Sequence, residues 1–243
     1  MSIFKLQQFS ITQHVNAMKV CTDSLIFGAL IPIKTLLTNE PPRVLDIGTG
    51  TGILSLMAMQ RGVASVTALE LMPDSALEAK ENIAASRWAD SVDVLQQDFR
   101  DYQSEQLFDL IISNPPFFEE HLKSDDKLRA AARHTDTLSY VQLLTNSKKL
   151  LNNNGQIFLL LPCHTVANIK KISDTLGLNV LQQTDFITLR GGIAKVCALT
   201  IAPSFAPSEK SLIHNSLTIY DSHQQYSQDS TRLLADFLLR FTH

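Results

Sequence analysis

The sequence predicts an α/β fold: a Rossmann-like, mostly parallel sheet of seven strands, with helices on both faces and an antiparallel last strand. Three observations support this prediction. An apolar strand pattern at residues 44–47 leads through a glycine-rich turn into an apolar helix pattern that begins near Thr51. Apolar runs then alternate with helical patterns as far as residue 201. Acidic residues stand at the ends of three successive strand-like runs, where a parallel sheet binds its ligands.

The composition is that of one globular domain. The chain has 243 residues, of which 44% are apolar and 19% charged, so it can bury a sizeable core. We expect a single domain over residues 1–243, made of a ligand-covering extension (1–40), a catalytic core (41–201) and a C-terminal loop, strand and helix (202–243). The formal net charge of −3 gives no overall basic field, although a local basic patch would suffice to bind phosphates.

The three cysteines indicate a reducing compartment. Cys21, Cys163 and Cys197 are odd in number, lie far apart in the sequence and form no C-x-x-C pair, which argues against a disulfide framework or a zinc site. The first residues show no basic-then-apolar leader, and the longest apolar run, 25–33, is too short to span a bilayer. We therefore expect a soluble, cytoplasmic protein without a membrane segment.

The region before the sheet is predicted to contain short extended segments and one helix. Thr22 or Asp23 offers an N-cap for an apolar helix that runs towards Leu37, with Pro32 bending or ending part of it. The same two residues could instead lie over a bound ligand, and the sequence leaves both interpretations open.

The glycine turn after the first strand has the pattern D-x-G-x-G-x-G, formed by Asp46, Gly48, Gly50 and Gly52. Glycine permits positive φ and a close approach of the backbone to a ligand at a helix N-terminus. A nicotinamide or flavin fingerprint would need a further glycine where Ile53 stands, so a dinucleotide is disfavoured. A tight turn without a ligand is the alternative.

Two further acids point to an adenosine-bearing cofactor. Glu70 ends the second predicted strand, 65–69, where a carboxylate can accept hydrogen bonds from both ribose hydroxyls. After a helix at 74–86 and a strand at 92–95, Asp98 can accept from the exocyclic amine of an adenine, with Phe99 beside the ring. A solvated strand-end carboxylate is the alternative for either acid.

The chemistry is predicted at the end of the fourth strand, 108–113, which leads into Asn-Pro-Pro-Phe-Phe at 114–118. An aromatic or amide amine is a poor nucleophile because its lone pair is delocalised. The Asn114 side-chain oxygen and the Pro115 carbonyl can accept both of its N–H bonds, and the fixed φ of proline holds these carbonyls outward. Phe117 offers a face on which a base can stack. An ordinary proline turn is the alternative.

Residues 119–137 are charged and mixed, as in a loop beside an active site. Arg133 and His134 could meet phosphates or bases there, and a solvated loop is the alternative. A helix at 138–151 is expected to stop at Asn-Asn-Asn-Gly, residues 152–155. The remaining expected elements are a strand at 156–161, a helix at 165–176, antiparallel strands at 180–189 and 195–201, a short strand at 216–220 and a terminal helix whose apolar stripe is core.

The order of these motifs resembles amino-group methyltransferases of the class I fold over roughly residues 40–201. Met18-Lys-Val, Thr22-Asp23, the Asn-Pro-Pro-Phe-Phe motif, Arg133-His134 and the tail containing Tyr220 and Tyr226-Ser227 look closest to the bacterial valine-tRNA methyltransferases. That family modifies N6 of the adenine 3′ of the anticodon. It usually has glycine where Cys21 stands, and a positive φ at that position would strain a cysteine.

The resemblance implies S-adenosyl-L-methionine (SAM) as cofactor and tRNA as partner, with no metal and no membrane, and favours a monomer. It implies that Asp46 handles the amino end of the cofactor. The implied cofactor-binding residues are Thr22, Asp23, Asp46, Gly48, Thr49, Gly50, Gly52, Glu70, Leu71, Asp98, Phe99 and Asn114. The implied catalytic residues are Asn114, Pro115, Pro116 and Phe117, and the implied RNA contacts are Phe118, Arg133 and His134.

Other functions remain open at this stage. The same chemistry could act on guanine N2 or adenine N6 of rRNA, or on a protein glutamine, although glutamine enzymes typically carry tyrosine where Phe117 stands. A non-catalytic RNA-binding module could keep the fold, but it would not need the acids and the Asn-Pro-Pro-Phe motif. A nicotinamide oxidoreductase is disfavoured by Ile53.

Overall fold

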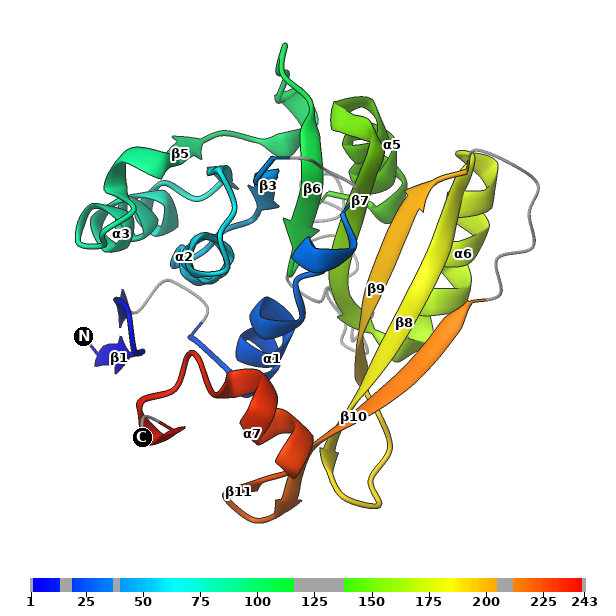
Figure 1. Ribbon diagram of the computed structural model, residues 1–243. Helices are drawn as coiled ribbons and strands as arrows, with labels where there is room; N and C mark the ends of the chain where they lie inside the picture. Colours follow the sequence, from blue (N-terminus) through cyan, green and yellow to red (C-terminus); the bar gives the residue numbers. More distant parts are fainter. Residues whose placement is uncertain (1, 14–18, 37–39, 116–137, 205–211, 242–243) are drawn as a thin grey trace, which may run out of the picture.

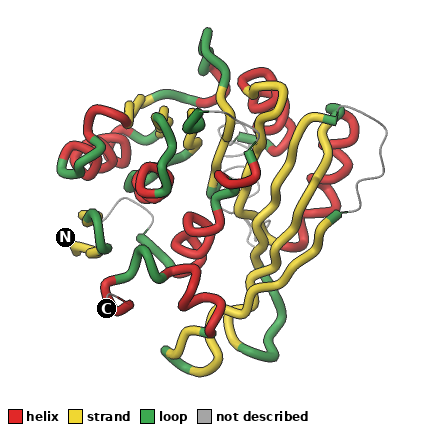
Figure 2. Tube along the Cα trace, in the orientation of Figure 1, coloured by secondary structure: helices red, strands yellow, loops and turns green. Residues whose placement is uncertain are grey.

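A large mixed sheet forms the centre of the molecule (Figures 1 and 2). The computed structural model describes residues 2–13, 19–36, 40–115, 138–204 and 212–241. Within these residues the sheet consists of β3 (Arg43–Ile47), β4 (Ser65–Glu70), β5 (Val92–Gln96), β6 (Phe108–Ser113), β7 (Leu151–Pro162), β8 (Leu178–Leu189), β9 (Val196–Pro203), β10 (Ile213–Ser222) and β11 (Gln225–Tyr226).

The strands lie in the order β11-β10-β8-β9-β7-β6-β3-β4-β5. The five from β7 to β5 are parallel, and β9 runs antiparallel to both β7 and β8. From β3 the chain adds β4 and β5 on one side and then returns to add β6 on the other. Ligands of such sheets bind beyond the carboxyl ends of the strands at this reversal point, so the fold places a site beyond β3 and β6.

The first four strands of the parallel sheet are confirmed nearly residue for residue. β6 has the predicted bounds, and β3, β4 and β5 are each one residue longer than predicted. They were recognisable because strands buried on both faces are continuous apolar runs. In β3 every residue from Val44 to Ile47 is buried, including Asp46.

The seven predicted strands are confirmed, the last of them being the antiparallel β9, but the described sheet is larger. β10 pairs in parallel with β8 from Ile213 to Tyr220, and β11 pairs with β10. The predicted strand at 216–220 is therefore too short. The sequence also gave no indication that this strand joins the central sheet. Local alternation reveals a strand but not the strand with which it pairs.

The predicted helix stop at residues 152–155 is wrong. The helix ends at Leu150, and β7 begins at Leu151 and runs through this segment. A register shift absorbs the extra residues, because Leu151 pairs with Phe108 whereas Gln156 pairs with Leu110. Gly155 is needed for space rather than for a left-handed turn, since a Cβ there would lie 2.7 Å from Leu151 Cγ.

Helices cover both faces of the sheet, each over its own apolar core (Figure 1). None of those in the described part of the chain is long and apolar enough to cross a membrane. One face carries α1 (Thr22–Leu30), α2 (Ile53–Gln60), α3 (Pro73–Ala84) and α7 (Gln228–Leu234), and the other carries α5 (Tyr140–Leu150) and α6 (Val166–Thr175).

The N-cap of α1 is Cys21, one residue before the predicted Thr22 or Asp23. Its backbone N–H donates to the Ser24 side chain, which caps this end of the helix. Cys21 has φ −120°, so its extended backbone carries no strain despite the side chain. The helix ends at Leu30, well before Leu37. Phe27 fixes α1 to the sheet by stacking on Phe158, with ring centroids 4.4 Å apart.

The two ends of the chain pack together (Figure 1). The predicted extended segments before α1 are confirmed as the hairpin of β1 (Ser2–Lys5) and β2 (Ser10–Gln13). Between these strands, the Gln7 side chain donates to the carbonyls of Ala235 and Leu238. The predicted terminal helix is shorter than its pattern, because α7 ends at Leu234, but its apolar stripe is core as predicted: Leu234, Phe237 and Leu238 are buried.

Candidate active site

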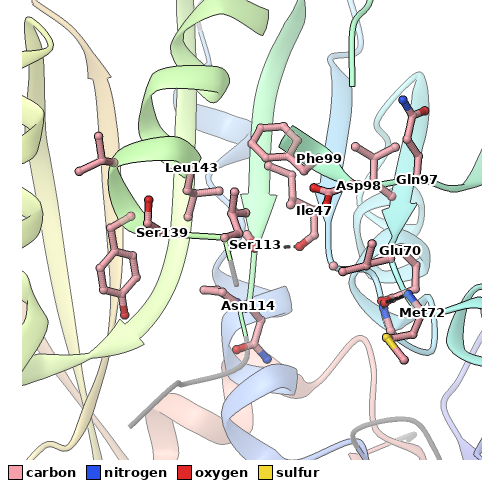
Figure 3. Close-up of a pocket in the computed structure, with 18 of the residues that line it drawn as sticks. Ile47, Glu70, Met72, Gln97, Asp98, Phe99, Ser113, Asn114, Ser139 and Leu143 are labelled. Atoms are coloured by element: carbon pink, nitrogen blue, oxygen red, sulfur yellow. Dashed lines mark hydrogen bonds between the residues drawn. The ribbon is translucent and has the colours of Figure 1, made fainter. Parts of the chain in front are cut away.

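A cavity of about 840 Å³ lies beyond the carboxyl ends of the parallel strands (Figure 3). One wall follows β4 and β5 and includes Glu70 and Asp98, and Ser113 and Asn114 at the end of β6 form the middle. The opposite wall comes from α5 and from the segment after β7. Figure 3 shows Glu70 and Asp98 on one side of the cavity and Ser139 on the other.

The glycine turn borders this cavity at Gly48 and Gly50. Their φ angles are +71° and +57°, and a Cβ at either position would meet no atom within 4 Å. The backbone therefore offers an open, side-chain-free surface that a ligand can approach closely. Gly52 serves the helix instead, since it is the N-cap of α2 with φ +83°, and a Cβ there would lie 3.3 Å from Ile83 Cδ1.

Asp46 lies beneath the glycine turn, not on the cavity wall. It is fully buried, and its Oδ2 accepts hydrogen bonds of 2.7 Å from the hydroxyls of both Thr49 and Ser55. Its Oδ1 has no hydrogen-bond partner among the described residues. Burial raises the pKa of Asp46 to about 6, against the lowering effect of the two hydroxyls. Asp46 thus orients Thr49, which is itself buried, and through it the turn.

Glu70 ties the turn to the next loop. Its Oε2 accepts from the backbone N–H of Gly50 at 2.9 Å, and its Oε1 accepts from that of Met72 at 3.0 Å. A carboxylate has about four lone-pair sites, so each oxygen can accept a further donor from the cavity. Leu71 lies beside it on the cavity wall and is 48% exposed, so it leaves an apolar surface open to a ligand.

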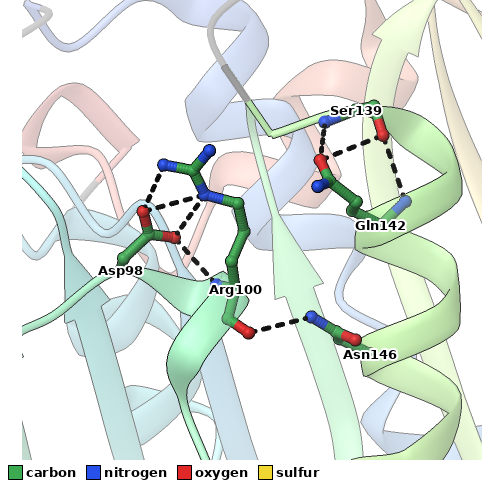
Figure 4. Close-up of polar contacts among 5 residues, drawn as sticks. All are labelled: Asp98, Arg100, Ser139, Gln142 and Asn146. Atoms are coloured by element: carbon green, nitrogen blue, oxygen red, sulfur yellow. Dashed lines mark hydrogen bonds and ion pairs between the residues drawn. The ribbon is translucent and has the colours of Figure 1, made fainter. Parts of the chain in front are cut away.

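Asp98 lies at the cavity edge in an ion pair with Arg100 (Figure 4). Arg100 Nη2 lies 2.5 Å from Asp98 Oδ2, and the Arg100 backbone N–H donates to Oδ1. These hydrogen bonds lower the pKa of Asp98 below its ordinary value. Phe99 is buried next to Asp98 and lines the same wall.

Asn114 and Pro115 follow β6 directly and line the middle of the cavity. Ser113 anchors this strand end, because its hydroxyl donates to the carbonyl of Ile47 at the end of β3 at 2.8 Å. The Asn114 Oδ1 atom is buried and has no hydrogen-bond partner among the described residues. An unpaired amide oxygen of this kind is costly unless a donor is brought to it.

Comparison with known proteins agrees with this geometry. Residues 15–184 match the family described as methyltransferase small domain. A protein of Bacteroides thetaiotaomicron named tRNA1(Val) (adenine(37)-N6)-methyltransferase is 35% identical, with 97% of each chain covered. A protein of Glaesserella parasuis with the same name is 37% identical, over 99% of this chain and 98% of its own. The chain belongs to the tRNA1(Val) (adenine(37)-N6)-methyltransferase family.

The fold of this methyltransferase is shared more widely. The solved structure of a predicted O-methyltransferase from Agrobacterium tumefaciens superposes with a TM-score of 0.59 at 17% identity, over 87% of this chain and 95% of its own. At that identity the likeness supports the predicted class I fold and nothing more specific.

The opposite wall of the methyltransferase cavity was not predicted. Ser139 caps α5, since its hydroxyl accepts from the Gln142 N–H while the Gln142 side chain accepts from the Ser139 N–H (Figure 4). Tyr140 follows on the same wall, and His164 and Thr165 come from the turn after β7. The rule that found Glu70 and Asp98 would also have indicated His164 and Thr165, because they too follow the carboxyl end of a parallel strand.

Thr22 and Asp23 do not line this cavity. Thr22 lines a second cavity, of about 470 Å³, and its hydroxyl lies 2.9 Å from the Tyr220 hydroxyl. Tyr220 in turn stacks on Tyr226 at 4.7 Å between centroids. The tail residues singled out in the sequence thus hold the start of α1 against β10. A contact of Thr22 or Asp23 with the cofactor stays a prediction.

Five predicted site residues lie outside the described residues, so the structure says nothing of their positions. They are Pro116, Phe117, Phe118, Arg133 and His134.

Proposed function

We propose that this methyltransferase transfers the methyl group of SAM to the exocyclic N6 of an adenine in tRNA, the adenine 3′ of the anticodon in a valine tRNA. The observation that carries the proposal is the buried, unpaired Oδ1 of Asn114 at the cavity wall. It is an acceptor without a donor, at the place where the sequence predicts an amine to be held. The relatives named above support the choice of tRNA and of the adenine.

The residues along β3, β4 and β5 fit an adenosyl cofactor. Gly48 and Gly50 leave the backbone open, and the Glu70 carboxylate keeps lone pairs for two ribose hydroxyls. Asp98 would accept from the adenine amine, with Leu71 and Phe99 supplying apolar surface for the ring. When bound, SAM supplies a methyl group on a positively charged sulfur, which makes the methyl carbon electrophilic.

On the acceptor side, the chain has to orient a weak nucleophile. The Asn114 Oδ1 and the Pro115 carbonyl would accept the two N–H bonds of the adenine amine and direct its lone pair at the methyl carbon. The nitrogen would bond to the methyl carbon as the bond between that carbon and sulfur breaks, and the alkylated nitrogen would then release a proton to water. Catalysis of this kind is mainly positioning, and it needs no general base before transfer.

The anticodon loop suits such a site. Its bases are already largely unpaired, so moving one into the cavity costs less free energy than extracting a base from a duplex.

The test is transfer of labelled methyl groups from SAM to unmodified tRNA, rRNA and protein by the purified chain. Nuclease digestion and nucleoside mass analysis should find N6-methyladenosine in valine tRNA. Label in guanosine, in rRNA or in a protease-sensitive product would overturn the proposed acceptor but keep the reaction. Absence of SAM binding in calorimetry would overturn the reaction itself and favour a non-catalytic RNA-binding module.

A further inference from the structure

Two cysteines and an aspartate that are far apart in the sequence meet at one point of the sheet. The Sγ atoms of Cys163 and Cys197 and a carboxylate oxygen of Asp185 all lie within 4.8 Å of one another. The sequence spacing argued against a metal site, but it could not show this arrangement, because strand pairing creates it.

The sheet fixes each of the three residues separately. Asp185 on β8 and Cys197 on β9 are direct cross-strand partners, so their side chains share one face. Cys163 follows the end of β7, where its backbone N–H donates to the Lys195 carbonyl. Cys197 is fully buried, whereas Cys163 and Asp185 are partly exposed. The cluster therefore lies at the border of the core, with two of its three residues partly exposed to solvent.

Neighbouring side chains orient the aspartate. His214 on β10 holds Asp185 Oδ2 through its Nε2 at 2.8 Å, and the Gln183 amide donates to Oδ1 at 2.7 Å. Hydrogen bonds to a carboxylate are how proteins aim a metal ligand. Among the described ion pairs, Asp185 has His214 as its partner and no lysine or arginine.

The surroundings of the cluster disfavour free thiolates. Burial and the nearby carboxylate raise the pKa of the Cys163 thiol, and burial together with the other thiol does the same for Cys197. A divalent ion would reverse this, because a coordinating thiol is deprotonated outright.

We propose that Cys163, Cys197 and Asp185 bind one zinc ion, with water in the fourth position. Two thiolates with one carboxylate suit tetrahedral zinc, whose ligand atoms stand about 3.5–3.8 Å apart. The observed cluster would close on the ion by roughly 1 Å. On binding, the two thiols release their protons to water and two sulfur–zinc bonds form.

The site would brace the methyltransferase cavity without taking part in transfer. Cys163 opens the short 3-10 helix Cys163–Thr165, whose His164 and Thr165 line the large cavity. A zinc ion would fasten this turn to β8 and β9. Because the ion would bind the folded chain, it would also raise the melting temperature as its free concentration rises.

The experiment uses cobalt as a spectroscopic probe on the full chain, purified under reductant, stripped with chelator and checked by circular dichroism. We expect one cobalt ion per chain, with the thiolate-to-cobalt absorption of a tetrahedral site. C163S should roughly halve this absorption and weaken binding at least about tenfold, and D185N should keep the absorption but weaken binding by about 10–100-fold. C21S is the matched control, since Cys21 lies outside the cluster, and it should bind as the wild type does.

Absence of thiolate-to-cobalt absorption in the folded wild type would overturn the proposal. So would unchanged affinity in both C163S and D185N, which would place the metal elsewhere. If the stripped protein instead loses two free thiols in air, and reduction restores them without cobalt binding, the pair is a disulfide-forming pair and not a metal site. The test does not depend on C197S, because Cys197 is buried and its replacement could disturb the fold itself.

Discussion

Arg100 holds both carboxylate oxygens of Asp98 at the edge of the cavity, from a position two residues further along the chain. The pair keeps Asp98 ionised and fixes its direction, but a carboxylate still has lone pairs for another donor. We predict that Asp98→Ala raises the Kd for SAM by at least about tenfold, the effect of losing a hydrogen bond to a charged group. Calorimetry measures it.

The control for Asp98 is Asp101→Ala. Asp101 ends the same 3-10 helix, Phe99–Asp101, and is exposed away from the cavity lining. SAM affinity should stay unchanged in this variant. An equal loss in both variants would mean that the helix, and not the Asp98 carboxylate, supports binding.

Gly50→Ala should separate backbone strain from loss of the ligand surface. Gly50 and Gly62 both have positive φ, +57° and +89°, and a Cβ at either would meet no atom within 4 Å. Each alanine should therefore lower the free energy of unfolding by about 1–2 kcal/mol. Only Gly50 borders the cavity, so only Gly50→Ala should also weaken SAM binding. Denaturant titration and calorimetry check the two effects, and weaker binding by Gly62→Ala would contradict the assignment.

The sequence allowed the strand-end acids to be found, but it did not show which of them face the cavity. Glu70 and Asp98 face the cavity, whereas Asp46 lies beneath the glycine turn. All three lie at or just beyond the carboxyl end of a parallel strand, and the direction of a side chain there depends on the register of that strand, which spacing does not reveal. On the far wall, Tyr140 escaped for a related reason, because its place depends on which elements the sheet brings opposite one another. His164 follows the carboxyl end of β7, so the strand-end rule would have indicated it.

The cysteines show the same limit more sharply. Cys163 and Cys197 meet because β9 turns back antiparallel between β7 and β8. The antiparallel pair was predicted, but its insertion beside β7 is a choice of topology that local patterns do not contain. Features encoded locally, such as the turn glycines and the apolar run of β6, are the ones that a sequence shows best.

Asp46→Asn should change how stability depends on pH. The pKa of Asp46 is about 6 in the folded chain against an ordinary value of 3.8, so the folded state binds more protons between these two values. Stability from this group is therefore present below about pH 4 and is lost as the pH rises to about 6. The loss amounts to about 3 kcal/mol in all.

The measurement is the free energy of unfolding of wild type and Asp46→Asn from pH 4 to pH 8. The wild type should lose stability relative to the variant between about pH 4 and pH 6, and the difference should be flat above pH 7. A constant difference for Asp46→Asn would mean that burial does not shift the pKa of this carboxylate.

Asn114→Ala tests the acceptor side of the site alone. The Asn114 Oδ1 atom has no partner among the described residues, so its loss breaks no hydrogen bond of the described fold and should leave stability close to that of the wild type. If this oxygen holds the amine during transfer, kcat/KM for tRNA should fall by about 10²–10³-fold, as for other donors or acceptors that act in the transition state. The Kd for SAM should stay nearly unchanged, because the other proposed cofactor contacts, along β3, β4 and β5, remain in place. Asn179→Ala, on the distant strand β8, controls for loss of an asparagine amide as such. If Asn114→Ala loses SAM affinity in step with activity, Asn114 binds the cofactor. The proposal that its Oδ1 accepts from the adenine amine would then be overturned.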